Sequence, residues 1–183
     1  GDSGELSISL RCPTFVFEGG AAGGAVPTSI KGSLSRREGL EVSYPVQPIG
    51  SSGELEVRLR LQWSTSEGVL HKWAEFRLVD APEPLLLKEV ILEQVDMPGQ
   101  NPQLEGSGVQ SYPAFWRGFF AGIEFPVAAT RVEGERVVVA HRPGCTLRNG
   151  EWHESRKAVF GIAPAGSERQ QFARYIKAHR PKP

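Results

Sequence analysis

The sequence predicts a mainly β protein, an antiparallel β-sandwich or supersandwich with one C-terminal helix. Two observations support this fold class. Apolar and polar residues alternate with period two in several short segments, as they do in strands that bury one face. Turns rich in Gly, Pro, Asn and Ser separate these segments, and a helical period occurs only near the end of the chain. Many short strands followed by one helix favour a sandwich over a βαβ fold.

Short strands are expected in the N-terminal third, at residues 6–12 (LSISLRC), 14–19 (TFVFEG) and 40–46 (LEVSYPV). A glycine-rich stretch at residues 19–24 follows the second of these. It lacks the Gly-Lys-Ser/Thr ending of a phosphate loop, and no recognisable helix follows it. We therefore interpret this stretch as a flexible hairpin turn.

The clearest alternation lies in the middle of the chain. In residues 55–63 (LEVRLRLQW), apolar side chains alternate strictly with charged or polar ones. Residues 69–79 (VLHKWAEFRLV) repeat the pattern after a turn at STSEG, so we expect the two segments to pair as a hairpin. DAPEP then interrupts the chain, and residues 85–95 (LLLKEVILEQV) supply a third strand.

Residues 96–111 are rich in Pro, Gly, Asn and Ser and predict a long loop, and loops of this length inside a compact domain are often functional. Strands are expected to resume at residues 119–126, 135–141 and 153–162. Turns at Arg-Pro-Gly and Arg-Asn-Gly-Glu lie between the last two of these segments.

Only the end of the chain has helical periodicity. Residues 167–180 (SERQQFARYIKAHR) begin with Ser167 as a candidate N-cap and place Phe172, Tyr175 and Ile176 at helical spacing. The proline that follows ends the helix. Residues 1–183 are few enough to form a single domain with a substantial core.

Composition argues against two classes of partner. The chain has 21 Lys and Arg residues against 21 Asp and Glu residues, and its pI is near 7.1. A balanced charge creates no long-range field for nucleic acid or for an anionic membrane surface. Apolar runs are only a few residues long, whereas a membrane-spanning helix needs roughly 20 residues. We therefore expect no nucleic-acid partner and no membrane partner.

Cysteine and histidine usage predicts no metal and no other cofactor. The four histidines share no metal-ligand spacing with one another or with the cysteines. A bridge between Cys12 and Cys145 would close a long loop and stabilise the fold by roughly 5 kcal/mol on the chain-entropy model. We favour two separate reduced thiols, because two cysteines form no disulfide framework. No G-x-S-x-G elbow supports a serine nucleophile.

Aromatic and polar residues predict a carbohydrate site. A sugar ring can stack on an aromatic face of a concave sheet while charged groups hold its hydroxyls. The candidate ligand-binding residues are Trp73, Trp116, Arg117, Glu124 and His141. For each tryptophan the alternative is an ordinary position in the core or at a strand edge.

Glu124 is the most unusual of these candidates, because it lies in the apolar segment FFAGIEFP. Burying an unpaired carboxylate costs several kcal/mol, so this side chain must face solvent or have a partner. Period two places it on the same face of a strand as Phe120. Two interpretations stay open: a structural partner for Arg117 or Arg131, and a ligand for a sugar or cation at a cleft.

Three segments resemble the β-supersandwich domain of alpha-galactosidase-like glycoside hydrolases. They are LHKWAEFRLV with PLLLKEVILEQV, FFAGIEFPVAATRVEGERVVVAHRPGCTL, and SRKAVFGIAPAGSERQQFARYIKAHRP, and together they cover about residues 69–183. The resemblance implies a non-catalytic domain that supports a (β/α)-barrel active site and contributes to sugar recognition. It also implies that residues 167–180 lead toward a barrel beyond Pro183, which would carry both catalytic carboxylates. The N-terminal part looks short for a complete supersandwich.

Two other classes of function stay open. One is a stand-alone carbohydrate-binding or adhesive sandwich whose aromatic face binds polysaccharide directly. The other is a mutarotase-like enzyme on the same fold, which would use a histidine as acid and a glutamate as base. His141 with Glu124 is the only pair that the sequence nominates for that role. The carbohydrate interpretations favour an extracellular or periplasmic location.

Overall fold

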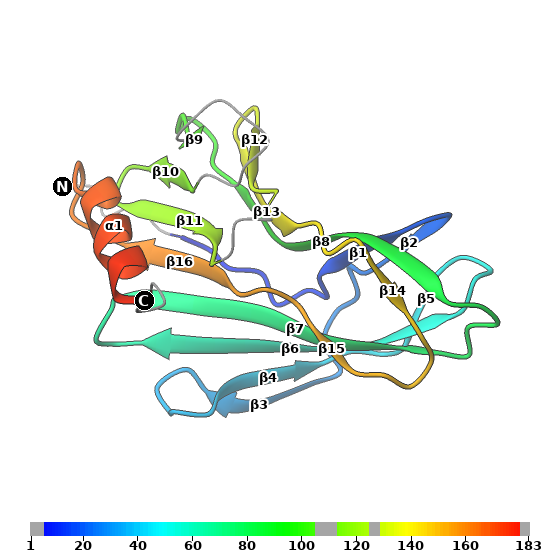
Figure 1. The fold of residues 1–183 in the computed structure, drawn as a ribbon. Coiled ribbons are helices and arrows are strands. Elements are labelled where there is room, and N and C mark those ends of the chain that lie inside the picture. Colours follow the sequence, from blue (N-terminus) through cyan, green and yellow to red (C-terminus); the bar gives the residue numbers. More distant parts are fainter. Residues whose placement is uncertain (1–5, 105–112, 125–128, 180–183) are drawn as a thin grey trace.

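The computed structural model describes residues 6–104, 113–124 and 129–179. In this part of the chain two antiparallel sheets enclose a common apolar core, and one helix lies on the larger sheet (Figure 1). The structure confirms the expected fold class, a mainly β sandwich with a single C-terminal helix.

The smaller sheet is built around one long strand. Its members are β1 (Thr14–Phe17), β2 (Gly20–Ala22), β8 (Leu85–Asp96), β12 (Arg131–Glu133), β13 (Arg136–His141) and β14 (Cys145–Leu147). The order is β12-β13-β8-β1-β2, and β14 also pairs with β8. β8 is therefore the central strand of this sheet.

The larger sheet has one face toward the core and one outer face, on which the helix lies. Its members are β3 (Ser29–Ser33), β4 (Gly39–Ser43), β5 (Gln47–Pro48), β6 (Glu54–Ser64), β7 (Val69–Val79), β9 (Gln103–Leu104), β10 (Ala114–Trp116), β11 (Phe119–Ile123), β15 (His153–Glu154) and β16 (Ala158–Ile162). The order is β3-β4-β6-β7-β16-β11-β10-β9, with β5 on β6 and β15 on β7.

The β6–β7 hairpin confirms the strongest prediction from the sequence. Its two strands pair along their whole length, from Glu54 opposite Val79 to Ser64 opposite Val69. Leu55, Val57 and Leu59 point into the core between the sheets, and the charged residues between them point outward. Strict alternation therefore determined which face of each strand became the outer face of the protein.

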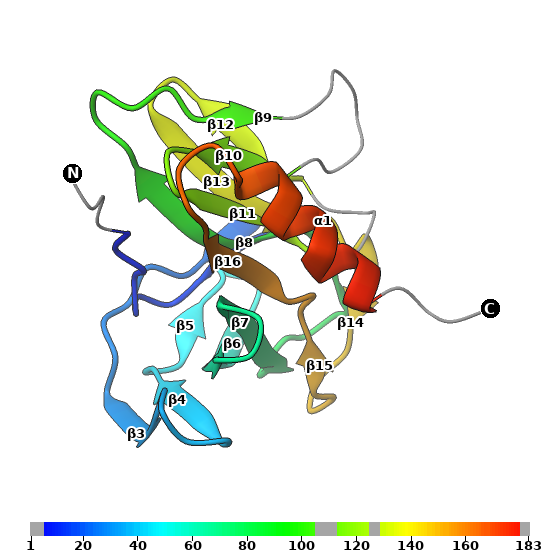
Figure 2. The same ribbon diagram turned by 90° about the vertical axis from the view of Figure 1, so that its left-hand side faces the viewer.

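Helix α1 (Glu168–His179) lies on the outer face of the larger sheet, against β10, β11 and β16 (Figure 2). Tyr175 is its buried residue, and it packs in a second apolar cluster with Val69, Phe115, Phe120 and Val159. Phe172 and Ile176 pack against the same cluster. The three residues at helical spacing thus form the buried side of the helix, as expected from the sequence.

The start of α1 differs from the expectation. The Ser167 hydroxyl donates a hydrogen bond backward to the carbonyl of Pro164, at 2.7 Å. The Glu168 carboxylate instead accepts from the backbone amides of Gly118, at 2.6 Å, and Gly166. An acidic side chain in the first turn of the helix therefore ties it to the β10–β11 turn.

Residues 6–12 form no strand, which corrects the prediction made from their alternating pattern. The backbone of Ser9 bonds to side chains instead of to a neighbouring strand: its amide donates to Glu93 and its carbonyl accepts from Lys72. Leu6, Ile8 and Leu10 still pack against the core. The alternating pattern therefore predicted which side chains face the core. Among the described residues, backbone pairing in this segment is confined to Cys12, which bonds to Gly24 and Ala25.

Several observed strand boundaries differ from the predicted ones, because contacts with distant segments determine where strand pairing ends. The strand expected at residues 153–162 is divided into β15 and β16, with Ser155 between them accepting a hydrogen bond from the Ala74 amide at 2.9 Å. The stretch at residues 19–24 contains β2, so it is the second arm of a hairpin with β1 as well as a turn. The expected loop at residues 96–111 contains β9, and its residues 105–111 lie outside the described residues, as do residues 125–126 of the expected strand 119–126.

A buried ion pair crosses the core between the two sheets. The Lys72 ammonium on β7 lies 2.8 Å from the Glu93 carboxylate on β8, and the Lys72 side chain is 1% exposed. Cys12 and Cys145 are both free thiols. No helix among the described residues is long and apolar enough to cross a membrane.

Candidate functional site

The outer face of the larger sheet carries a dense set of polar and aromatic side chains. Along β7, His71, Trp73, Glu75 and Arg77 are partly buried and point outward, whereas the residues between them lie in the core. The facing positions of β6 carry glutamate, arginine and glutamine. This sheet face therefore combines the aromatic and polar side chains that ligand sites use.

A row of side chains crosses this face and contains two of the predicted site residues. Arg60 is the cross-strand neighbour of both Glu41 and Trp73, and its guanidinium lies 2.7 Å from the Glu41 carboxylate. The Lys157 ammonium lies 4.7 Å from the centroid of the Trp73 ring, in cation–π range. The backbone carbonyl of Lys157 accepts from the Glu124 amide at 3.1 Å. Trp73 and Glu124 thus lie on one face with Lys157 between them.

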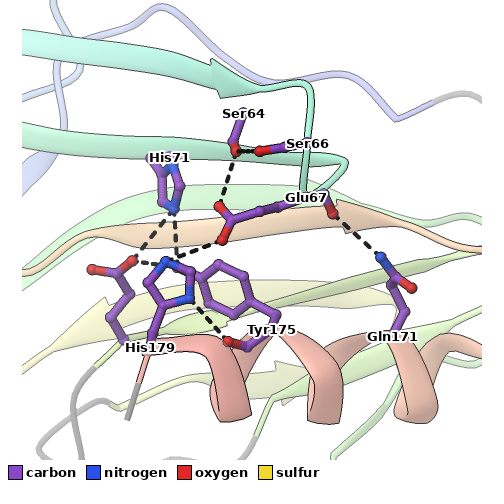
Figure 3. A network of polar contacts seen from close by, with 8 residues as sticks. Ser64, Ser66, Glu67, His71, Gln171, Tyr175 and His179 are labelled. Carbon is purple, nitrogen blue, oxygen red and sulfur yellow. Dashed lines mark hydrogen bonds and ion pairs between the residues drawn. The ribbon is translucent and has the colours of Figure 1, made fainter. Parts of the chain in front are cut away.

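Glu124 is held by two side chains from distant parts of the chain, Tyr175 and His71. The Tyr175 hydroxyl on α1 donates a short hydrogen bond to its carboxylate. His71 Nε2 lies 2.9 Å from the Tyr175 hydroxyl and 3.4 Å from the Glu124 carboxylate (Figure 3). Because the tyrosine proton points to Glu124, the hydroxyl oxygen accepts from His71 Nε2, which must therefore carry a proton.

A second contact of the same kind holds the end of α1. His179 Nδ1 lies 2.9 Å from the carbonyl oxygen of Tyr175, and His179 Nε2 lies 3.2 Å from the Glu67 carboxylate (Figure 3). Ser64 donates to the same carboxylate at 2.9 Å, and the Gln171 amide donates to the Glu67 carbonyl. The β6–β7 turn therefore contacts helix α1 through the side chain and the backbone carbonyl of Glu67.

Electrostatics favour an ionised Glu124 and a protonated Tyr175. Burial alone raises the pKa of Glu124, but the hydrogen bonds from His71 and Tyr175, with the charges of His71 and Lys157, hold that pKa below its ordinary value. Burial and the neighbouring Glu124 raise the pKa of the Tyr175 hydroxyl far above its usual range. A tyrosine in this state donates a hydrogen bond but does not ionise near neutral pH, so it is not an acid or base at that pH. The cluster therefore anchors the helix.

The other three predicted site residues lie elsewhere. Trp116 is 4% exposed and stacks on Phe119 in the core between the sheets. His141 is also buried, and its Nε2 accepts from the Arg156 backbone amide at 3.3 Å. Arg117 is exposed in the β10–β11 turn. Of the five predicted site residues, Trp73 and Glu124 therefore share the outer face of the larger sheet. Trp116 and His141 are buried away from it.

Of the two interpretations of Glu124, the structural pair with an arginine is wrong. The Glu124 carboxylate contacts His71 and Tyr175. Arg131 instead binds the carboxylates of Glu89, at 2.8 Å, and Glu133, at 2.7 Å. The sequence placed Glu124 on the correct face with Phe120, but it did not show that a helix covers that face.

Sequence reasoning also missed His71, Lys157 and Tyr175 as neighbours of the predicted site. His71 had a usable signal, because it lies two residues before Trp73 on the same strand and therefore shares its face. Tyr175 lies 51 positions from Glu124, and no local pattern reports such a contact. Among the described residues, no group of three or more His, Cys, Asp or Glu side chains could hold a metal ion.

Comparison with models of known protein families and with curated proteins found no match for this sequence.

Proposed function

We propose that this chain is a non-catalytic, carbohydrate-associated β-sandwich domain of an alpha-galactosidase-like glycosidase. In this role it supports a (β/α)-barrel active site and contributes side chains to sugar recognition. The resemblance of residues 69–183 and the sandwich fold agree with this role. The partners it implies are a carbohydrate and a barrel domain, and it needs no cofactor.

The observation that carries the proposal is the position of Trp73 on the outer face. Its indole ring lies between charged groups on both sides, with Arg60 opposite it on β6 and Lys157, in the link between β15 and β16, over its ring. Sugars present both C–H surfaces, which stack on aromatic rings, and hydroxyls, which bond to charged groups. A sheet face with both kinds of group suits a carbohydrate.

The chemistry of this face supports a non-catalytic role. A glycosidase needs two carboxylates with different protonation states at a fixed separation. On this face the Glu124 carboxylate is occupied by Tyr175 and His71, and Arg60 binds the carboxylates of both Glu41 and Glu75. These carboxylates hold the structure together and are not free for acid–base chemistry.

The mutarotase-like alternative loses support for a physical reason. An acid or base must be within hydrogen-bonding reach of its substrate. His141 is buried and already accepts a hydrogen bond from the protein backbone. We therefore do not retain the pair of His141 and Glu124 as a catalytic proposal.

The same outer face favours a second candidate, a stand-alone carbohydrate-binding or adhesive module. The mass of the native polypeptide separates the two candidates. A product several times larger than 20.0 kDa supports an accessory domain, whereas a product close to 20.0 kDa supports the stand-alone module.

If the native polypeptide is several times larger than 20.0 kDa, enzyme kinetics test the accessory-domain proposal. Trp73→Ala in the full-length enzyme should raise the KM for an α-galactoside and leave kcat unchanged, because it removes binding without touching the reacting groups. An enzyme without any glycosidase activity would contradict the accessory-domain proposal.

A further inference from the structure

A second part of the outer face forms a hollow of about 310 Å³. Its lining comes from three elements: Arg58 on β6, Glu75 on β7, and the segment Trp152, His153 and Glu154 at β15. The lining contains none of the five candidate ligand-binding residues named from the sequence, Trp73, Trp116, Arg117, Glu124 and His141.

Trp152 is the exposed aromatic group of this hollow. Its side chain is 39% exposed, which is unusual for a tryptophan in a folded domain. The guanidinium carbons of Arg58 and Arg77 lie 4.4 and 4.8 Å from the centroid of its ring. The Glu56 carboxylate in turn binds the Arg77 guanidinium at 2.6 Å. These contacts hold the indole ring in place, so it is pre-organised for stacking.

Two carboxylates face each other at the edge of the hollow. Glu75 and Glu154 are direct cross-strand neighbours, an arrangement that is destabilising for like charges. Arg60 neutralises Glu75 through contacts of 3.2 and 3.4 Å. The Glu154 side chain is exposed and makes no hydrogen bond or ion pair with another described residue. Its oxygens can therefore accept hydrogen bonds from a ligand.

His153 in the lining of the hollow has a ring nitrogen without a hydrogen-bond partner among the described residues. Its ring stacks on Phe76, and its buried Nε2 has no hydrogen-bond partner among the described residues. The nearest acidic oxygen, on Glu151, lies 3.9 Å away. Buried polar atoms without a partner are rare, and a water molecule or ligand hydroxyl at the wall would satisfy this one.

We infer that this hollow is a subsite for one neutral pyranose ring, an assignment that rests on the proposed carbohydrate function. The C–H face of the sugar stacks on Trp152, a hydroxyl donates to Glu154, and Arg58 donates to a hydroxyl oxygen. The volume is at the lower end of the roughly 300–1,000 Å³ of ligand pockets, which suits one ring. Glu154 places a carboxylate without a counter-charge among the described residues at the hollow, so the hollow disfavours an anionic sugar.

The test is an NMR titration of the chain with methyl α-D-galactopyranoside, methyl α-D-glucopyranoside and the methyl glycoside of galacturonic acid. A neutral glycoside should shift the Trp152 indole resonance. Trp152→Ala and Glu154→Gln should each weaken its affinity roughly tenfold, because the first removes the stacking surface and the second removes the charge that strengthens the hydrogen bond from the sugar hydroxyl. Both residues are exposed, so both variants should keep the wild-type spectrum elsewhere.

The matched control is Ile162→Ala, which truncates another exposed apolar side chain outside the hollow and should leave the affinity unchanged. Wild-type affinity in Trp152→Ala together with lost affinity in Trp73→Ala would overturn the subsite and leave the proposed function standing. No binding of either neutral glycoside to the wild-type chain would overturn sugar recognition itself. Tighter binding of the galacturonide would overturn the assignment to a neutral sugar.

Discussion

The Lys72 ammonium and the Glu93 carboxylate form an ion pair of 2.8 Å across the core, between strands of opposite sheets. The Ser9 backbone completes the arrangement, since its carbonyl accepts from Lys72 and its amide donates to Glu93. One pair of side chains therefore joins both sheets to the N-terminal segment.

Breaking this pair should destabilise the protein strongly. Lys72→Met leaves the Glu93 carboxylate buried without its counter-charge, so we expect the free energy of unfolding to fall by roughly 3–5 kcal/mol. Urea denaturation measures this change. The control is Lys88→Met, which removes an exposed pair with Glu18 and should cost less than about 1 kcal/mol. Equal effects of the two substitutions would contradict the role of the buried pair.

Gly161 should tolerate no side chain. A Cβ atom there would lie 1.9 Å from the Phe120 ring, which is buried in the cluster beneath α1. We expect Gly161→Ala to lower the unfolding free energy by roughly 1–3 kcal/mol, because the ring must move. Gly122→Ala is the control, since its Cβ would meet Pro113 at 3.4 Å and needs a smaller adjustment. Thermal unfolding of the two variants should rank them in this order.

The docking of α1 should depend on the ionisation of Glu124. The folded-state pKa of Glu124 lies below the ordinary value of 4.5, so its contribution to stability is present above that value and is lost as the pH falls through the folded pKa. The protection factors of the amides in residues 168–179, which normalise exchange to its intrinsic rate at each pH, should therefore fall below pH 4.5 relative to those of β6. Glu124→Gln should reduce this acid dependence, and an unchanged profile would contradict the prediction.

Tyr175→Phe tests the same contact from the helix side. Removing the hydroxyl takes one hydrogen bond from the Glu124 carboxylate while leaving the apolar ring in the cluster. We expect the pKa of Glu124 to rise, because hydrogen bonds to the charged form had lowered it. An NMR titration of the Glu124 carboxyl carbon measures this pKa directly. The control is Tyr44→Phe, which removes a hydroxyl bonded to the Leu10 carbonyl and should leave the pKa of Glu124 unchanged.

His141 should make the protein less stable in acid. Burial, with a smaller effect from the Arg156 charge, lowers the pKa of its imidazole from 6.5 to about 4. Between these pH values the unfolded chain binds a proton at this residue and the folded chain does not, so stability falls as the pH falls, by up to about 3 kcal/mol. His141→Gln should flatten this slope in urea titrations between pH 7 and pH 4.5. Parallel slopes would show that other groups cause the acid sensitivity.

The sequence by itself determined the features that depend on neighbouring positions. Alternation along residues 55–63 and 69–79 was enough to place the charged side chains on one face and to expect the hairpin. Helical spacing of Phe172, Tyr175 and Ile176 likewise identified the buried side of α1. These features follow from local geometry, because a strand repeats every two residues and a helix about every 3.6.

Only the tertiary structure decided which distant groups meet. It paired Glu124 with His71 and Tyr175, buried His141 and Trp116, and left residues 6–12 outside both sheets. It also collected Arg58, Trp152 and Glu154 around one hollow. Such contacts join segments far apart in the chain, so they depend on sheet order and on how well the side chains pack, and no local period encodes either.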